Sequence, residues 1–380
     1  MSTLKVSKIE PVSSGGDCIV NATNIVGNKN LIINGAMEVA QRGTSTTTHN
    51  TLCVDRFKCF HGGTDEAPTF AQVALTSSDT GPWAKGFRKA LQITNGNQTG
   101  GAGAADEVDL YHQIEAQNIA SSGWDYTSSS SYITLSYWVK SSVAQNFYGY
   151  MVTSDGTNKM YLWETGSLTA NTWTKITKKI PGASGLQFDS DNGVGLGINF
   201  GPFWGSDYTT SNATLGSWGD WAGTARNVDN TTTWYTTNDA TFAITGVQLE
   251  VGDVATAFEH RTYADHLAAC QRYYFKKESD DGTDTMFGVG WASSGSYFQI
   301  MVFFPVTMRI PPSALETSGT PGDYRLNWSG GNNTGTGLIF STATKYNGQI
   351  QFQGGTFTDG QGGYLRTKEN DPYVAWSAEF

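Results

Sequence analysis

The sequence predicts an all-β protein: a jelly-roll β-sandwich preceded by a short N-terminal arm and followed by a second, smaller C-terminal β domain. Aromatic residues make up 13% of the 380 residues and charged residues only 15%, whereas about a quarter of an average soluble domain is charged. Forty-five glycines supply many tight turns. Between these turns, short runs of β-branched and aromatic residues recur at close spacing, which is typical of antiparallel strands.

Residues 1–29 form the predicted arm. They contain few apolar side chains, and only Leu4, Val6 and Ile9 indicate a brief strand near the start. A segment of this kind becomes ordered only by packing on something else. We therefore expect an arm that docks on a partner protein or on sister subunits; an unstructured leader is the alternative.

Residues 30–262 form the predicted sandwich. An Asp-Gly pair at 155–156 indicates a hairpin turn between two of its strands, and Pro181-Gly182 ends another. Many antiparallel strands bury one face by closing as two packed sheets, and a jelly roll is the most economical way to connect them. The clearest strands are expected at Tyr132–Lys140, Asn146–Thr153, Lys159–Thr165, Trp173–Ile180, Gly193–Phe200 and Thr241–Val251.

The alternation of apolar and polar residues that is typical of a strand ends after Val251. A turn at Gly252-Asp253 leads to residues 263–274, which we expect to be a short helical or extended junction. Residues 275–380 are the predicted distal β domain. Tyr297–Phe304 reads as a core strand that ends at Pro305, because proline cannot continue a central ladder.

Charge and hydropathy exclude several classes of partner. The net charge is −10 without a basic stripe, so no nucleic acid partner is expected. No window approaches the ~18 continuous apolar residues of a membrane span, and the first residues lack the apolar segment of a signal peptide. We expect synthesis in a cytoplasm and no membrane insertion. The scattered cysteines are expected to be buried thiols, although Cys53 and Cys59 could pair across a hairpin.

Three motifs resemble one family. They are Asn30–Thr44 (NLIINGAMEVAQRGT), Asp55-Arg56-Phe57, and the string from Gly246 to Tyr274. Together they resemble bacteriophage tail-fibre and receptor-binding proteins that contain a jelly roll like a carbohydrate-binding module. The resemblance implies a homotrimer in the virion, attached to other virion proteins through residues 1–29. It also implies attachment to host-surface polysaccharide without catalysis. A structural virion protein that never contacts the host, and a glycan depolymerase, are the alternatives.

A long aromatic stretch at residues 201–240 is the strongest binding signal. Long loops in compact domains are usually functional or assembly elements. Sugars stack their C–H faces on aromatic rings, whereas polar side chains bind their hydroxyls. Packing at a subunit interface or domain seam explains the same composition, and the Gly-rich distal loops are another candidate for recognition. The candidate carbohydrate-binding residues are Trp204, Tyr208, Trp218, Trp221, Trp234 and Tyr235.

Catalytic signals are weak, and we expect no catalytic residues and no enzyme activity. The five histidines are dispersed without metal-ligand spacing, and no nucleophile elbow is present. The acidic group of Asp106, Glu107 and Asp109 is the main enzymatic option, because glycan hydrolysis needs only two carboxylates. The cluster around Asp189 and Asp191 has the oxygen density of a structural calcium site, the one cofactor we consider.

Overall fold

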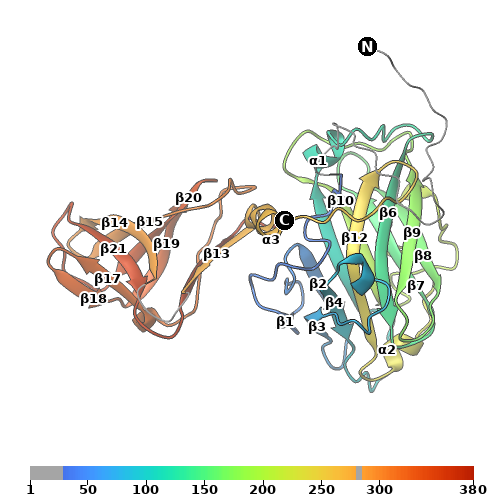
Figure 1. Ribbon diagram of the computed structural model, residues 1–380, viewed down its shortest axis with the longest axis horizontal. Helices are drawn as coiled ribbons and strands as arrows, with labels where there is room; N and C mark the ends of the chain where they lie inside the picture. The colour runs from blue at the N-terminus through green and yellow to red at the C-terminus, as the bar shows by residue number, and fades with distance from the viewer. Residues whose placement is uncertain (1–28, 280–284) are drawn as a thin grey trace, which may run out of the picture.

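The computed structural model describes residues 29–279 and 285–380 and confirms the all-β sandwich fold (Figure 1). Strands β1 to β12 form one unit, and β13 to β22 form a second unit on the other side of helix α3, Tyr263–Gln271. The predicted arm lies outside the described residues except for Lys29. Within these described ranges there are four other short helices: α1 Ala116–Ala120, α2 Thr233–Thr236, and the 3-10 turns Trp83–Lys85 and Pro321–Asp323.

The first unit is a sandwich of two six-stranded antiparallel sheets. Most connections take the chain from one sheet to the other, as in a jelly roll. In spatial order, the first sheet holds β1 Ser45–Thr46, β3 Thr69–Ala74, β4 Lys89–Thr94, β12 Thr241–Val251, β6 Tyr132–Ser141 and β9 Thr174–Pro181. The second sheet holds β11 Trp218–Asp220, β8 Lys159–Ser167, β7 Asn146–Thr153, β10 Val194–Trp204, β5 Glu107–Glu115 and β2 Phe57–Gly62.

The sandwich core lies between these sheets and follows from the alternation of side chains along each strand. In β6, Leu135, Tyr137 and Val139 point inward and are buried, because successive side chains of a strand face opposite sides. The Tyr137 hydroxyl accepts a hydrogen bond of 3.1 Å from the indole nitrogen of Trp163 on the opposite sheet. A large polar ring is thus accommodated in the core with its polar atom satisfied.

The second unit has a small sheet and a larger sheet, which we call the distal sheet. They enclose a core that includes Phe275, Phe298, Ile300 and Trp376. The small sheet holds β13 Tyr274–Glu278, β22 Tyr373–Ser377 and β16 Glu316–Thr317. In spatial order, the distal sheet holds β18 Gly331–Thr334, β17 Tyr324–Trp328, β21 Gly362–Thr367, β14 Met286–Ser294, β15 Tyr297–Phe303, β20 Asn347–Gln353 and β19 Gly337–Ala343.

The junction between the units begins with a well-capped helix. The Thr262 hydroxyl accepts a hydrogen bond of 3.2 Å from the Asp265 amide, and the Asp265 carboxylate accepts one of 3.3 Å from the Thr262 amide. This capping box fixes where α3 starts. The chain then passes directly into β13, so the predicted junction contains a helix followed by the start of a strand.

A buried polar cluster joins the two units, and we call it the seam. Glu115, at the end of β5, is fully buried and accepts hydrogen bonds from Arg272 (2.7 Å) and the Tyr273 hydroxyl (2.6 Å). Burial alone would raise the pKa of Glu115, but these hydrogen bonds more than offset it and lower the pKa. Nearby, Arg56 pairs with Glu379 and lies 3.5 Å from the centre of the Tyr273 ring. The last residues of the chain therefore return to the sandwich (Figure 1).

Removing the Glu115 carboxylate should destabilise the protein strongly. In Glu115→Ala, Arg272 and Tyr273 lose their shared partner inside the seam, and breaking one side of a buried pair typically costs about 3–5 kcal/mol. Chemical denaturation monitored by tryptophan fluorescence measures the change. The control is Asp253→Ala, which removes an exposed pair with Lys179 and should cost less than about 1 kcal/mol. If both substitutions lowered the free energy of unfolding equally, the Glu115 cluster would contribute no more stability than an exposed ion pair.

Candidate functional site

Two of the predicted binding residues, Trp234 and Tyr235, belong to the sandwich core. Helix α2 turns both rings inward, and neither has any exposed surface. The Tyr235 ring stacks on Phe203 at 4.3 Å between centroids, and the Trp234 indole donates to the Thr241 carbonyl at 3.0 Å. Rings without an exposed face cannot stack on a sugar, so we correct the prediction and remove both from the candidate site.

Trp204, at the end of β10, is also buried, on the other face of the second sheet. Its indole nitrogen donates a hydrogen bond of 2.8 Å to Asp109, and its ring lies 5.6 Å from that of Tyr150. Trp204 supports neighbouring side chains and presents no face to a ligand. It is therefore removed from the predicted stacking residues as well.

The three remaining aromatic residues are half-buried but do not form one site. Trp218 lies on β11 at the edge of the sheet, where its indole donates to the Pro181 carbonyl at 2.7 Å. It lines its own hollow of about 270 Å³. Tyr208 and Trp221 instead pack on the outer face of the second sheet, where the rings of Trp221 and Tyr150 lie 5.5 Å apart.

A pocket of about 280 Å³ lies on this outer face, and we call it the outer pocket. Strand register explains its composition, since Asn199 of β10 pairs with Tyr111 of β5 on one side and Tyr150 of β7 on the other. Paired residues point to the same face. The segment between β10 and β12 contributes the last two lining residues. The full lining is Phe60, Glu107, Asp109, Tyr111, Tyr150, Val152, Asn199, Trp221 and Arg226.

The outer pocket contains two carboxylates in different states. Glu107 forms a 2.9 Å ion pair with Arg226. Asp109 is buried, and burial together with the nearby Glu107 charge raises its pKa to about 7, although the hydrogen bond from Trp204 acts in the opposite direction. The Oδ1 atom of Asp109 has no hydrogen-bond partner among the described residues. Near neutral pH the site therefore offers one ion pair and one carboxyl group that readily gains or loses a proton.

Only part of this site was predictable from the sequence. Trp221 and the acidic group containing Glu107 and Asp109 were candidates there, but in separate sites. Asn199 and Tyr150 were missed, because their proximity depends on strand register across the sheet. The alternation within each predicted strand was the available signal, but it does not tell which strands are neighbours.

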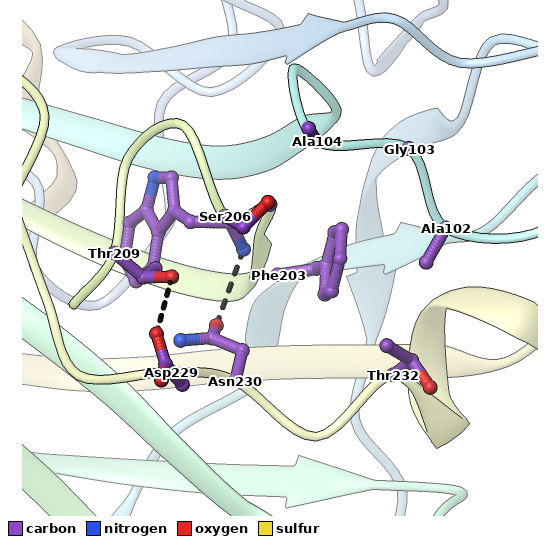
Figure 2. Close-up of a pocket in the computed structure, with 11 residues that line it drawn as sticks. Ala102, Gly103, Ala104, Phe203, Ser206, Thr209, Asp229, Asn230 and Thr232 are labelled. Carbon is purple, nitrogen blue, oxygen red and sulfur yellow. Dashed lines mark hydrogen bonds between the residues drawn. The ribbon is translucent and has the colours of Figure 1, made fainter. Parts of the chain in front are cut away.

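A second hollow of about 200 Å³ lies beside Trp204, lined by small and polar residues (Figure 2). The Thr209 hydroxyl donates to Asp229 at 3.0 Å, and the Asn230 side-chain oxygen accepts from the Trp204 amide at 3.1 Å. These polar groups bond to one another and hold the loop in place. Phe203 is the only ring besides Trp204 in this lining, so the hollow is a weaker candidate for sugar binding.

The proposed calcium ligands lie in a loop before β10. Asp191 accepts a hydrogen bond of 2.9 Å from the Gly193 amide, and Asp189 accepts one of 3.0 Å from Gln187. Over residues 29–279 and 285–380, no group of three or more His, Cys, Asp or Glu side chains is arranged to hold a metal ion. Calcium at Asp189 and Asp191 stays a prediction.

Among the helices of the described residues, none combines the length and the apolar character needed to span a bilayer. The cysteines Cys53, Cys59 and Cys270 are buried free thiols.

Comparison with known proteins gives distant structural similarities. No protein-family model and no curated protein matches the chain. The enzymatically active domain of bacteriophage CBA120 tailspike protein 4 is 11% identical, with a TM-score of 0.31 over 59% of this chain and 22% of that chain. The N-terminal cellulose-binding domain of Cellulomonas fimi β-1,4-glucanase C is 12% identical, with a TM-score of 0.26 over 57% of this chain and 99% of that domain. The family 11 carbohydrate-binding module of Clostridium thermocellum is 10% identical, with a TM-score of 0.24 over 57% and 98%. Similarity at this level assigns no family.

The burial of the tryptophans predicts different effects on stability. Trp234→Ala should lower the free energy of unfolding by about 3–5 kcal/mol, the usual range for truncating a buried tryptophan. Trp221→Ala removes a half-buried ring from the surface and should cost no more than about 1–2 kcal/mol. Thermal and urea unfolding of both variants provide the comparison. Similar losses would mean that Trp221 is as essential to packing as Trp234.

Protonation of Asp109 should make stability depend on pH. The folded protein keeps the Asp109 proton up to about pH 7, whereas the unfolded chain releases it near pH 4. The contribution of Asp109 to stability therefore falls as pH rises between these values, by at most about 1.4 kcal/mol per pH unit. Relative to Asp109→Asn, wild type should therefore lose about 2 kcal/mol of its free energy of unfolding between about pH 5 and pH 8. A pH-independent difference would place the carboxyl pKa near its ordinary value.

Proposed function

We propose that this protein binds glycans in the outer pocket without catalysing a reaction. The main support is a hollow that three partly exposed aromatic side chains, Phe60, Tyr111 and Trp221, line together with polar groups, while the buried ring of Tyr150 packs against Trp221. Aromatic rings suit the apolar faces of sugars, and a few convergent polar groups fix the orientation of a ligand. At about 280 Å³ the hollow is near the lower end of the ~300–1,000 Å³ range of ligand pockets. We therefore propose that it accepts one unit of a longer chain.

The polar groups of the pocket suit hydroxyl recognition. The guanidinium of Arg226 donates hydrogen bonds, the carboxylate of Glu107 accepts them, and the amide of Asn199 does both. Glu107 and Arg226 neutralise each other, so this pair adds no net charge to the pocket. Glu107 is held in place by strand β5. Arg226 is held by packing, since its guanidinium lies 4.3 Å from the centre of the Tyr208 ring.

The same contacts favour binding over hydrolysis. Glycoside cleavage needs one carboxyl group to protonate the leaving oxygen and a second to act on the opposite side of the sugar. Asp109 is buried and bonded to Trp204, and Glu107 is paired with Arg226. We therefore propose that neither carboxyl group acts on a glycosidic bond.

We further propose that the protein belongs to a phage virion, as a tail-fibre-like homotrimer that attaches to host-surface polysaccharide. The support comes from the sequence motifs at Asn30–Thr44, Asp55–Phe57 and Gly246–Tyr274. In this proposal, residues 1–29 connect the protein to other virion proteins. Its biological role would then be adhesion, with the outer pocket as the contact to the host.

Binding to polysaccharides tests the proposed site. Wild-type protein should bind a subset of purified cell-surface polysaccharides on a glycan array, and calorimetry should show roughly tenfold weaker binding for Trp221→Ala, because a stacking ring contributes about 0.5–1.5 kcal/mol. Trp218→Ala is the matched control, since Trp218 is half-buried on the same sheet but lies outside the pocket.

Three results would contradict the proposal. Binding to none of the polysaccharides would remove its basis, and equal losses in both tryptophan variants would place the site elsewhere. Release of new reducing ends from a bound polysaccharide would show catalysis. The pocket would then need to be reconsidered as a hydrolytic site built on Glu107 and Asp109.

A further inference from the structure

The distal sheet has one face in the core and one open face. In β15, Phe298, Ile300 and Val302 point into the core and are buried. The alternate residues point outward, and strand register places their neighbours on the same face: Val289 pairs with Met301, and Ile339 pairs with Gln351. The outward residues are unusually exposed for large apolar side chains: Phe303 68%, Val289 52%, Trp291 43%, Ile339 43% and Tyr297 41%. We call this surface the open face.

The open face carries no charged side chain over four strands. Strands β14, β15, β20 and β19 are consecutive neighbours in the sheet and contain no Asp, Glu, Lys or Arg. Charges begin beyond β14, where Arg366 of β21 and Arg325 of β17 are paired and point to the same side, because they alternate with the buried Leu365 and Leu326. Glutamines occupy the outward positions around the apolar side chains, namely Gln299, Gln349, Gln351 and Gln353. The chain as a whole has a net charge of −10, so its acidic groups lie elsewhere.

The size of the open face matches a protein–protein contact. Three aromatic and two aliphatic side chains, each about half exposed, provide roughly 400 Å² of apolar area, given that aromatic side chains offer ~150–250 Å² each. One partner in a standard interface buries about 800 Å², a little over half of it apolar. The largest apolar patch on most monomers is ~300–600 Å² and is often functional. The apolar side chains and the glutamines around them therefore suffice for one such contact.

We propose that the open face binds a second copy of this chain. Two identical chains of net charge −10 repel each other, and they meet at least cost where neither surface is charged. Glutamine amides both donate and accept hydrogen bonds, so rows of them can pair with the same rows on another copy where identical chains meet around a symmetry axis. The buried Oε1 atom of Gln299 has no partner among the described residues. This proposal is independent of glycan binding in the outer pocket.

Light scattering after size-exclusion chromatography tests the proposal on the full chain. At micromolar concentration, wild type should have a mass at least twice the 41.0 kDa of one chain. Phe303→Lys and Trp291→Lys place charges on the open face and should weaken assembly at least tenfold, which shifts the mass to that of one chain. Val254→Lys is the control: Val254 is 67% exposed but follows β12 in the sandwich, so its variant should assemble like wild type.

Two further measurements keep the test decisive. Thermal unfolding shows whether the lysine variants remain folded. If they do not, oxidative footprinting of wild type replaces them, and Trp291 and Tyr297 should be protected at high protein concentration relative to low. A monomeric wild type, lysine variants that keep the assembled mass, or a footprint unchanged by concentration would overturn the proposal.

Discussion

The buried carboxylate of Glu115 is the constraint on which the arrangement of both units depends. It lies at the end of β5, and its hydrogen bonds to Arg272 and Tyr273 connect that strand to the start of the second unit. An ionised group inside a protein is tolerated only when its charge and lone pairs are satisfied. A shift of β5 by one residue would turn every one of its side chains to the other face. The seam therefore also fixes Asp109 and Tyr111 in the outer pocket, on the same strand.

Strands with a clear period of two were predictable from the sequence. Asn146–Thr153 and Thr241–Val251 match β7 and β12 at both ends, because turn residues flank each apolar alternation. Helix α2 was not predictable in this way. Its four residues are too short for a helical period, and the surrounding Thr, Asn and Asp residues have the composition of a loop. Trp234 and Tyr235 were therefore candidates for a ligand site or an interface, although they fill the core.

The aromatic stretch at residues 201–240 packs mainly within and on the sandwich itself, which is neither the sugar site nor the subunit interface or domain seam that the sequence suggested. Most of its rings stabilise the fold: Trp234 and Tyr235 pack inside the sandwich, and Trp204 holds Asp109. Of the rings in this stretch, Trp221 lines the outer pocket, together with rings from three strands. Aromatic side chains in a segment rich in Gly, Ser and Thr gain most of their burial from the sheet beneath, because the segment itself offers little to pack on. Such a segment covers the sheet incompletely, and the outer pocket is what remains uncovered.

A polar seam explains how two units with different surfaces can act together. An apolar contact of the same size would tolerate sliding, since apolar packing is not directional. The seam instead requires particular donors and acceptors to meet. Arg309 donates to the Asn192 carbonyl of the sandwich at 2.9 Å, while bonds of 2.8 and 2.6 Å to the Ala378 and Glu379 carbonyls hold its guanidinium in place within the second unit. The bonds that cross between the units, to Asn192 and to Glu115, are lost if one unit rotates, so the orientation is specific. Where copies meet through the open face, the direction in which each outer pocket points is therefore set by the seam.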